Sequence, residues 1–457
     1  MIDRPALELD LLRGTFSGEL HTPADPTYDE ARMAWNLAAD QHPALVALPR
    51  TPEDVVALVA FARGAGLRIA PQGTGHNAAP LGSLAQSILL KTSLMRGVEI
   101  DVRGRRARAE AGALWSDVAG PASDHGLAAL AGSSPDVGVV GYALGGGIGW
   151  LARAFGLCCN SVTAIELVTP DGELVRCDHE NRPELFWALR GGTGSFGVVT
   201  AIEIMLIAIP ELYAGAMLWP WERASEVLHA WREWTVDAPE SATTSARILQ
   251  IPPVPDIPEP FRGRQFVCID GAVLGSESYA NEVLAPLKAL EPEIDSFGMA
   301  PPIALSHLHM DPEHPVPGIS DTAMLEELTP ETIDALVEAG GPGSGSPLLL
   351  VEVRHLGGAL ARVPAGAGAR SRLDAPYIMF ALGSPMTPEL AAAIPPHLAK
   401  VVEAVAPWAA DGVYLNFAER TTDTRRAFSE DAYAALQAVK AEVDPDGLIQ
   451  SNHEIVR

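Results

Sequence analysis

Residues 71–77 read Pro-Gln-Gly-Thr-Gly-His-Asn, and residues 132–149 form a second loop that is dense in glycine. Glycine lacks the Cβ that keeps a main chain away from a ligand, and successive N–H groups in such turns converge on anions. The two segments therefore predict a backbone that lies against an extended, phosphate-bearing cofactor. The histidine at position 76 offers that cofactor a covalent handle.

Length and charge restrict the class of protein. With 457 residues the chain exceeds what one hydrophobic core usually organises, so two or three subdomains are expected. Lys and Arg number 32 against 58 Asp and Glu, and the net charge of -26 would repel nucleic acid and anionic lipid. No stretch approaches the roughly 20 apolar residues of a membrane span. We therefore expect neither nucleic acid nor a membrane as a partner, and the oligomeric state stays open.

Cysteine and histidine suggest two further chemistries, and neither has the framework it needs. Four cysteines are too few and too scattered for a disulfide framework, which favours a reduced, cytoplasmic setting. The adjacent Cys158 and Cys159 are expected to pack as small apolar residues. His307-Leu308-His309 with His314 has the alternation of a metal site on a strand, but prolines break the segment and no Cys or carboxylate framework accompanies it. We expect a surface loop there and no metal.

The first half of the chain alternates short strands and helices. Thr51-Pro52-Glu53-Asp54 is a helix start, with a capping threonine, proline in the first turn and acids at the positive end of the dipole. Pro170-Asp171-Gly172 is a hairpin signal. The pattern also predicts a helix over 183–189 and strands over 67–70, 87–91, 98–102, 107–111, 162–168, 173–176 and 198–206.

From about residue 210 the texture changes, because loops rich in proline, glycine and serine separate the regular runs. The pattern predicts strands over 347–353 and 377–382 and helices over 224–236 and 388–405. It is typical of a separate α+β layer whose loops cover a substrate pocket. The tail then predicts a strand over 413–417 and a helix over 430–443.

A Rossmann fold is one explanation of the glycine turns, since G-x-G-x-x-G joins its first strand to a helix. Here Gly73-Thr74-Gly75-His76-Asn77 is followed by residues 78–82, which have no helical pattern. The spacing therefore disfavours a Rossmann dehydrogenase.

Several motifs occur in a fixed order along the chain. A G-G-H type turn appears as Gly73-Thr74-Gly75-His76, and a V-G-x-x-G-x-x-x-G-G-G-x-G loop runs from Val137 to Gly149. The signature L-F-W-A-L-R-G-G-x-G-x-F-G-V-V-T runs from Leu185 to Thr200, and a Tyr-x-Asn motif follows at 414–416. Together these motifs resemble the berberine bridge enzyme-like family of FAD-linked oxidases, of the vanillyl-alcohol-oxidase type. The resemblance covers nearly the whole chain.

The resemblance implies an α+β fold with two domains. A PCMH-type FAD-binding domain would span residues 1–208, in two subdomains that meet near 95–105. Residues 209–409 would form an α+β substrate domain, with an antiparallel sheet covered by helices. Residues 410–457 would return to the FAD-binding domain.

The activity implied is oxidation of an alcohol or amine of a small molecule, of the secondary-metabolite or sugar type. Hydride would pass to flavin N5, and O2 would reoxidise the flavin to give H2O2. Three alternatives stay open: a redox-neutral cyclisation or isomerisation, another electron acceptor, and a flavin-retaining binding or storage protein.

His76 is implied to carry an 8α-histidyl bond to FAD; the alternative is a histidine that merely lines the pocket. Many relatives have a second link through the cysteine of G-x-C-x-x-V-G, but Ser134 stands at that place and cannot form a thioether. A single covalent attachment, through His76, is therefore predicted. The cofactor-binding residues that the resemblance implies are His76, Gln72, Gly73, Thr74, Gly75, Asn77, Ser134, Asp136, Val137, Gly138, Gly141, Tyr142, Gly145, Gly146, Gly149, Asn160, Val199, Asn416 and Asn452.

For catalysis, the resemblance places Tyr414 near the flavin ring as a base or an orienting group; the alternative is a tyrosine of the core. We expect Tyr414 and Asn416 on one face of a strand. The ordinary pKa of tyrosine, about 10, would have to be lowered by a neighbour. Tyr377 and His355 are candidate partners, each with a structural role as the alternative.

Overall fold

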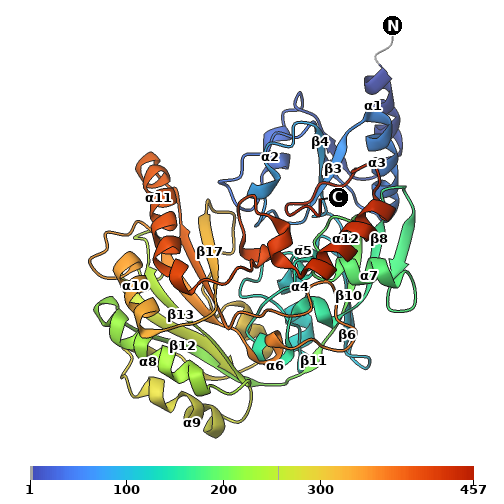
Figure 1. Ribbon diagram of the computed structural model, residues 1–457. Coiled ribbons are helices and arrows are strands. Elements are labelled where there is room, and N and C mark those ends of the chain that lie inside the picture. Colours follow the sequence, from blue (N-terminus) through green and yellow to red (C-terminus); the bar gives the residue numbers. More distant parts are fainter. Residues whose placement is uncertain (1–3, 256, 457) are drawn as a thin grey trace.

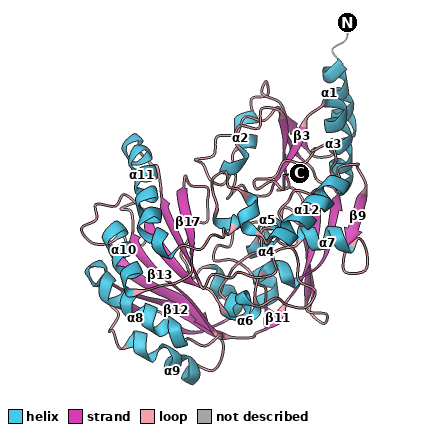
Figure 2. Ribbon diagram, in the orientation of Figure 1, coloured by secondary structure: helices cyan, strands magenta, loops and turns pink. Residues whose placement is uncertain are grey.

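The computed structural model describes residues 4–255 and 257–456 and arranges them around three sheets of four or more strands (Figures 1 and 2). Residues 1–3, 256 and 457, which the predicted domain ranges include, lie outside the described residues. The largest sheet and its helices form one side of the molecule, and the other two sheets form the opposite side together with the C-terminal segment (Figure 1). The mixture of helices and antiparallel sheets confirms the α+β class.

The first sheet carries the glycine turn at the end of one strand. Its order is β1-β2-β4-β3, with β1 antiparallel to β2 and the other two pairs parallel. The strands are β1 (Glu19–His21), β2 (Leu45–Leu48), β3 (Arg68–Gln72) and β4 (Ser87–Lys91). Because β3 ends at Gln72, the turn that follows lies at the edge of this sheet.

Helix α3 (Pro52–Ala65) packs beside this sheet and begins as predicted. The Asp54 N–H donates to the Thr51 hydroxyl at 3.3 Å, while the Asp54 carboxylate accepts from the Thr51 N–H at 3.3 Å. The helix ends at Gly66, whose φ of 68° is the left-handed conformation that glycine adopts without strain. Two further helices precede α3 in the chain: α1 (Arg4–Thr15) and α2 (Tyr28–Arg32).

The second sheet is antiparallel, in the order β5-β6-β10-β8-β9. The strands are β5 (Val98–Asp101), β6 (Arg106–Glu110), β8 (Val162–Val168), β9 (Leu174–Cys177) and β10 (Val198–Met205). Strands β8 and β9 pair antiparallel across residues 170–172, which confirms the predicted hairpin. The short β7 (Leu127–Ala128) and β11 (Ile207–Ala208) pair separately. The helices of this region are α4 (Trp115–Ser123), α5 (Val139–Leu144), α6 (Ala152–Phe155) and α7 (Pro183–Leu189).

The third sheet is much larger than the two strands that the sequence predicted for it. Its order is β15-β12-β14-β13-β18-β19-β17, with β16 also paired to β12, and every pair is antiparallel. The strands are β12 (Leu212–Pro220), β13 (Ala242–Gln250), β14 (Gln265–Val273), β15 (Ile294–Asp295), β16 (Gly298–Ala300), β17 (Ile319–Leu325), β18 (Leu350–His355) and β19 (Tyr377–Gly383).

Helices cover one face of the third sheet and leave the other face to the rest of the molecule (Figure 1). These helices are α8 (Ala224–Asp237), α9 (Glu277–Lys288), α10 (Pro330–Gly340) and α11 (Pro388–Val405). On β13, Ala246 and Ile248 belong to the apolar core under the helices. Since side chains alternate along a strand, Ser245 and Arg247 lie on the opposite face.

The C-terminal segment packs against the first two sheets. Helix α12 (Glu430–Val443) contacts α7, and Ile449 then bridges to Ile69 of β3 (Figure 1). The buried Lys440 ammonium lies 2.6 Å from the Asp444 carboxylate. The strand predicted over 413–417 is wrong, because the chain there forms a 3-10 helix, η7 (Leu415–Phe417).

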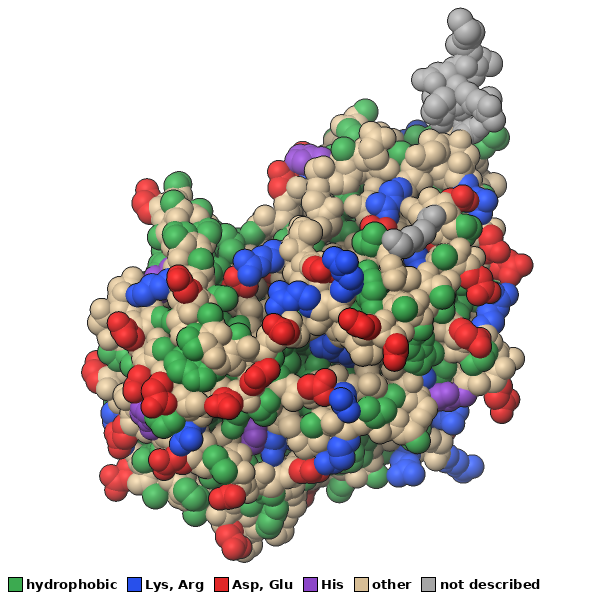
Figure 3. Space-filling model, in the orientation of Figure 1, with side chains coloured by type: hydrophobic (Ala, Val, Ile, Leu, Met, Phe, Trp, Pro, Cys, Tyr) green, Lys and Arg blue, Asp and Glu red, His purple; other side chains and the backbone are tan. Residues whose placement is uncertain are grey.

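The surface agrees with the acidic composition. Acidic side chains are spread over both parts of the face shown in Figure 3, with basic side chains between them. Among the residues that the structure describes, no helix is long and apolar enough to span a bilayer.

Candidate active site

A cavity of about 1360 Å³ lies between the glycine turn, the 132–145 loop and the face of the third sheet that the helices do not cover. Pockets for one drug-sized molecule are about 300–1,000 Å³, so this cavity has room for a dinucleotide and a substrate together. The predicted residues among its lining are Gln72, Gly73, Thr74, Gly75, His76, Asn77, Ser134, Val137, Gly138, Gly141, Tyr142, Gly145, Val199, Tyr414, Asn416 and Asn452.

Two glycines of this cradle are required by what they touch. Gly75 has a φ of 89°, and a Cβ there would lie 3.0 Å from the Cα of Ala34 and 2.8 Å from the Gln72 amide nitrogen. A Cβ at Gly145 would lie 1.6 Å from the Oδ1 of Asn416. The Asn416 amide meanwhile donates to the Tyr142 carbonyl at 3.0 Å. The η7 segment therefore fixes the second glycine loop through direct contact.

Several buried polar atoms of the cavity wall have no hydrogen-bond partner among the described residues. They are both amide atoms of Gln72 and the Oδ1 of Asn77. Buried polar groups of folded proteins are normally satisfied, so these atoms call for a polar ligand. The Asn77 amide nitrogen donates to the Leu415 carbonyl at 3.1 Å, which leaves Oδ1 directed elsewhere. The wall thus fits an elongated polar cofactor such as FAD.

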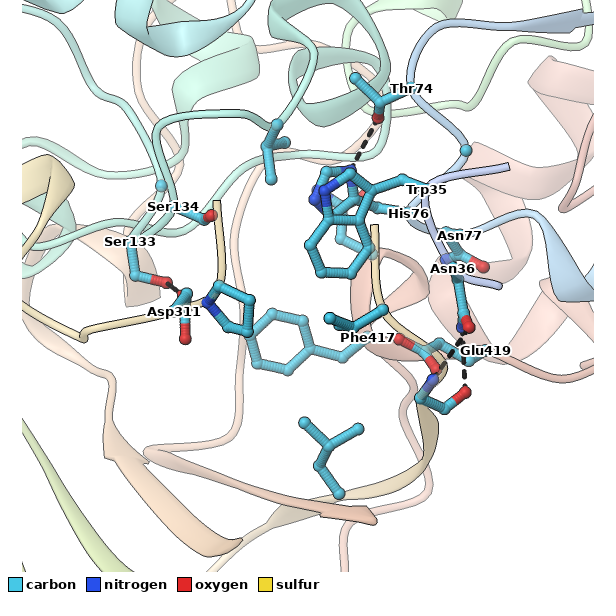
Figure 4. A pocket seen from close by; sticks show the side chains of 18 of the residues that line it. Trp35, Asn36, Thr74, His76, Asn77, Ser133, Ser134, Asp311, Phe417 and Glu419 are labelled. Atoms are coloured by element: carbon cyan, nitrogen blue, oxygen red, sulfur yellow. Dashed lines mark hydrogen bonds between the residues drawn. The ribbon is translucent and has the colours of Figure 1, made fainter. Parts of the chain in front are cut away.

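The surroundings of His76 hold its ring in one orientation (Figure 4). The Trp35 indole stacks on the imidazole, with ring centroids 3.9 Å apart and 16° between the planes. The Thr74 hydroxyl lies 2.7 Å from Nδ1, and the Asp136 carboxylate lies 3.4 Å from Nε2. Sequence reasoning did not find Trp35, because this contact joins positions 41 residues apart in the chain.

The Asp136 carboxylate, which does not line the cavity itself, hydrogen-bonds two side chains that do. Its carboxylate accepts from the Trp35 indole at 2.5 Å and from the Ser134 hydroxyl at 2.8 Å. Burial alone would raise the pKa of Asp136, but His76, Ser134 and Trp35 outweigh burial and lower the pKa. Asp136 is therefore a carboxylate at neutral pH and fixes the two side chains that flank His76.

Four of the predicted cofactor residues lie outside the lining of the cavity: Asp136, Gly146, Gly149 and Asn160. Asn160 instead holds a loop of the substrate region. Its amide nitrogen donates to the Ser371 carbonyl at 3.2 Å, and its oxygen accepts from the Gly368 N–H at 3.0 Å. The contacts of Asn160 are therefore between two parts of the protein.

Tyr414 lies in the cavity wall at the start of η7 and is almost fully buried. No side chain of the described residues hydrogen-bonds its hydroxyl, which lies near the backbone of Gly147. Burial raises its pKa above the ordinary value, which is opposite to the lowering that a base would need. Tyr414 and Asn416 do not share a strand face, since η7 replaces the strand. The geometry supports an orienting role for Tyr414 better than a basic one.

Tyr377 and His355 do not reach the cavity, so the structure does not support them as catalytic partners. The Tyr377 hydroxyl lies 2.8 Å from that of Thr235. The rings of Tyr377 and His355 stack on each other, with centroids 5.3 Å apart. The Nε2 of His355 accepts from the Arg153 guanidinium at 2.8 Å. Burial and the Arg153 charge lower the pKa of His355 to about 3. His355 is thus a neutral support for a buried arginine.

His309 corrects the expectation of a surface loop. It is buried in the loop between residues 306 and 319, against the face of the third sheet that the helices do not cover, with Nδ1 2.8 Å from Asp270 and Nε2 3.0 Å from Glu352. Burial and Arg247 oppose its protonation, yet the carboxylates prevail and raise its pKa to about 9. Arg247 in turn lies 2.5 Å from Asp270. No cluster of His, Cys, Asp and Glu that fits a metal ion occurs among the described residues.

Arg354 completes this buried network and borders the substrate side of the cavity. Its guanidinium bonds the Glu352 carboxylate and lies 5.0 Å above the ring centre of Phe417. Phe417 in turn contacts Tyr414 and Phe380, with ring centres 5.3 and 5.1 Å apart. The sequence analysis missed this wall, since its charged residues are scattered over three strands and one loop that are far apart in the chain.

Comparison with known proteins agrees with this geometry. The family model described as FAD binding domain matches residues 43–178. The (R)-6-hydroxynicotine oxidase of Paenarthrobacter nicotinovorans is 30% identical over 96% of this chain and 97% of its own length. The glucooligosaccharide oxidase of Sarocladium strictum is 32% identical over 47% of this chain and 44% of its own length.

Solved structures agree over the whole fold. The 6-hydroxy-D-nicotine oxidase of Arthrobacter nicotinovorans superposes with a TM-score of 0.79 at 26% identity, covering 95% of this chain and 97% of that one. The berberine bridge enzyme-like 1 protein of Physcomitrella patens superposes with a TM-score of 0.85 at 19% identity, covering 98% and 99%. The second likeness shows the fold alone.

Proposed function

The chain belongs to the berberine bridge enzyme-like family of FAD-linked oxidases, and we propose that it oxidises an amine or an alcohol of a small molecule with O2 as electron acceptor. When bound, FAD would accept a hydride from the substrate, and the reduced flavin would be reoxidised by O2, which is reduced to H2O2. The observation that carries this proposal is the cavity itself, because unpartnered polar atoms line its glycine cradle and an aromatic wall faces them.

His76 is the proposed site of covalent attachment, and the only one. The stack with Trp35 and the contacts to Thr74 and Asp136 support it, since a ring held in one orientation is ready to form a bond. Ser134 supports the single link, because its hydroxyl is committed to Asp136 and oxygen cannot give a thioether. The alternative, a histidine that only lines the pocket, predicts FAD that is released on denaturation.

The chain's own residues bind, orient and exclude water. Gln72 and Asn77 offer hydrogen bonds along the cradle, while Asn416 and Asn452 hold the loops that form it. Tyr414 closes the wall on the substrate side with a hydroxyl that is available to orient a reacting group. An amine is favoured over a sugar, because the relative that matches this chain over its full length is named for 6-hydroxynicotine, whose pyrrolidine nitrogen is an amine.

The test is an anaerobic screen of amines and alcohols against the holoenzyme, followed by admission of air. We expect at least one amine to bleach the flavin absorbance without O2, and each turnover in air to release one H2O2. Bleaching without H2O2 would indicate another electron acceptor. A substrate that is converted with no bleaching would indicate the redox-neutral alternative, and a flavin that no compound bleaches would favour a binding protein.

A further inference from the structure

Glu419 is an acidic side chain of the cavity wall that no step above uses. It follows η7 by two residues and lies on the same side of the cavity as Asn36 and Phe417 (Figure 4). No cationic side chain of the described residues lies within ion-pair distance of its carboxylate. The polar side chain that acts on it is the hydroxyl of Ser320, on β17. A carboxylate in such a place lacks the counter-charge that buried acids normally have.

The other acidic groups of this wall have partners. The Asp311 carboxylate accepts from the Ser133 hydroxyl at 3.2 Å, and Glu313 lies 2.9 Å from His307. Next to Ser320, Asp321 is paired with the Arg420 guanidinium at 3.0 Å. Among the described acidic residues of the lining, Asp311 and Glu313 thus have partners, whereas the Glu419 carboxylate has the Ser320 hydroxyl beside it and no ion pair.

The cations of the cavity are committed as well. Arg247 is bonded to Asp270, and Arg354 is bonded to Glu352. His309 lies between the two carboxylates, within 3.0 Å of each. Each of these three cations is bonded to a carboxylate of the network, and among the described residues none of them forms an ion pair with Glu419.

Two aromatic rings of the cavity wall belong to this region. Phe417 precedes Glu419 by two residues, and its ring centre lies 5.1 Å from that of Phe380. Burial raises the pKa of Glu419 to about 7, against a small opposing effect of Ser320. At neutral pH the side chain is thus balanced between acid and carboxylate, and a cation beside it would shift that balance to the carboxylate.

We propose that Glu419 binds the protonated amine of a basic substrate, with the rings of Phe417 and Phe380 beside the cation. The proposal rests on the proposed function, since it takes this cavity to be the substrate site. Charge and protons balance in either route. A neutral amine takes the proton of the Glu419 carboxylic acid, whereas a cation that arrives already charged displaces that proton to solvent. Aromatic faces attract a desolvated cation further.

The experiment is calorimetric titration of the oxidised holoenzyme with two probes of equal shape. One is (3-hydroxyphenyl)trimethylammonium, a permanent cation, and the other is 3-tert-butylphenol, its neutral counterpart. We expect the cation to bind at least about tenfold more tightly. At pH 7 its binding should release up to about half a proton, read from heats in buffers of different ionisation enthalpy.

Two variants make the test specific. Glu419→Gln keeps the shape of the side chain and should abolish both the preference and the proton release, while Glu419→Asp should retain the preference. The flavin spectrum and the melting temperature of each variant check that the cavity is intact. Equal binding of the two probes by the wild type, no binding of the cation, or a preference that survives Glu419→Gln would each overturn the proposal.

Neither probe is turned over, so the outcome is separate from that of the proposed function. A holoenzyme that binds the cation through Glu419 but whose flavin no amine reduces would contradict the proposed function alone. A holoenzyme whose flavin is reduced by amines, with no cation preference at Glu419, would contradict only the inference drawn here.

Discussion

The indole of Trp35 lies flat on the imidazole of His76, at a centroid distance of 3.9 Å. The same indole donates to the Asp136 carboxylate, which also lies 3.4 Å from the imidazole Nε2. One tryptophan therefore stacks on the proposed attachment site and binds the acid beside it. The segment that carries Trp35 is itself fixed to the glycine turn, since the Trp35 N–H donates to the Thr74 carbonyl at 2.9 Å.

The first prediction concerns the number of covalent links. Wild-type protein, digested after denaturation, should give a single flavin-bearing peptide, and that peptide should contain His76. His76→Ala should still bind FAD through the cradle but release all of it on denaturation. Mass spectrometry and flavin fluorescence in a denaturing gel measure both results. A second flavin-bearing peptide that includes Ser134 would contradict the single link.

The second prediction separates the two contacts of Trp35. Trp35→Ala removes the stack and the hydrogen bond, and the aromatic pair alone is worth about 0.5–1.5 kcal/mol, so we expect covalent incorporation of FAD to slow at least about 2- to 13-fold. Trp35→Phe keeps a stacking ring, so its rate of covalent FAD incorporation should lie between those of the wild type and Trp35→Ala. The measurement is the time course of gel fluorescence after FAD is added to apoprotein. Equal rates for all three proteins would show that the stack does not contribute to covalent incorporation of FAD.

The third prediction distinguishes the two roles of Tyr414. Its pKa is raised by burial, so it stays protonated in the neutral range and acts at most as a hydrogen-bond donor. Loss of one such bond costs about 0.5–1.5 kcal/mol, so Tyr414→Phe should slow anaerobic flavin reduction about 2- to 13-fold. Loss of a general base would instead slow flavin reduction on the order of 10²–10⁴-fold. Stopped-flow measurement of the anaerobic flavin reduction rate distinguishes the two roles.

The sequence predicted those parts of the fold that local chemistry decides. Thr51 caps α3, and Asp171-Gly172 turns the hairpin between β8 and β9, because each needs only its neighbours in the chain. Strand β14 was missed, since both of its faces are buried and residues 266–269 are apolar without alternation.

The sequence likewise predicted only part of the candidate site. The cradle around His76 follows from contiguous motifs, and those motifs were found. Trp35 reaches the cavity from a segment far from these motifs, and Glu419 follows the Tyr-x-Asn motif by three residues but is not part of it, so the motifs mark neither residue. The run 413–417 has the composition of a strand, but Asn416 bonds the glycine loop and the chain forms η7 instead.

The fourth prediction follows from the raised pKa of His309. A pKa of about 9 in the folded protein against an ordinary 6.5 means that this group's stabilisation is complete below pH 6.5 and is lost as the pH rises through 9. We expect the wild type to lose about 3 kcal/mol of unfolding free energy over this range relative to His309→Asn. Urea unfolding of both proteins at pH 6 and pH 10 measures it, and other titrating groups cancel in the difference. A difference that does not change with pH would show that His309 is not charged in the fold.

The fifth prediction concerns Arg153, which joins α6 to the third sheet. Its guanidinium donates to the Ala242 carbonyl at 2.8 Å, to the Ala238 carbonyl at 3.0 Å and to the Leu356 carbonyl. Arg153→Met fills similar space but leaves these buried acceptors unpaired, at about 1–3 kcal/mol each where water cannot reach them. We therefore expect a loss of at least about 3 kcal/mol in urea unfolding.

The matched control for Arg153 is Arg425, an exposed arginine that pairs with Asp423 at 2.9 Å. Arg425→Met should leave the free energy of unfolding nearly unchanged, because water replaces the lost partner. Equal costs for the two variants would mean that the Arg153 carbonyls find other donors. If Arg153→Met also loosens the probe binding measured at Glu419 while Arg425→Met does not, the shape of the cavity depends on this junction, in which Arg153 holds the start of β13 at Ala242 and the residue after β18, Leu356.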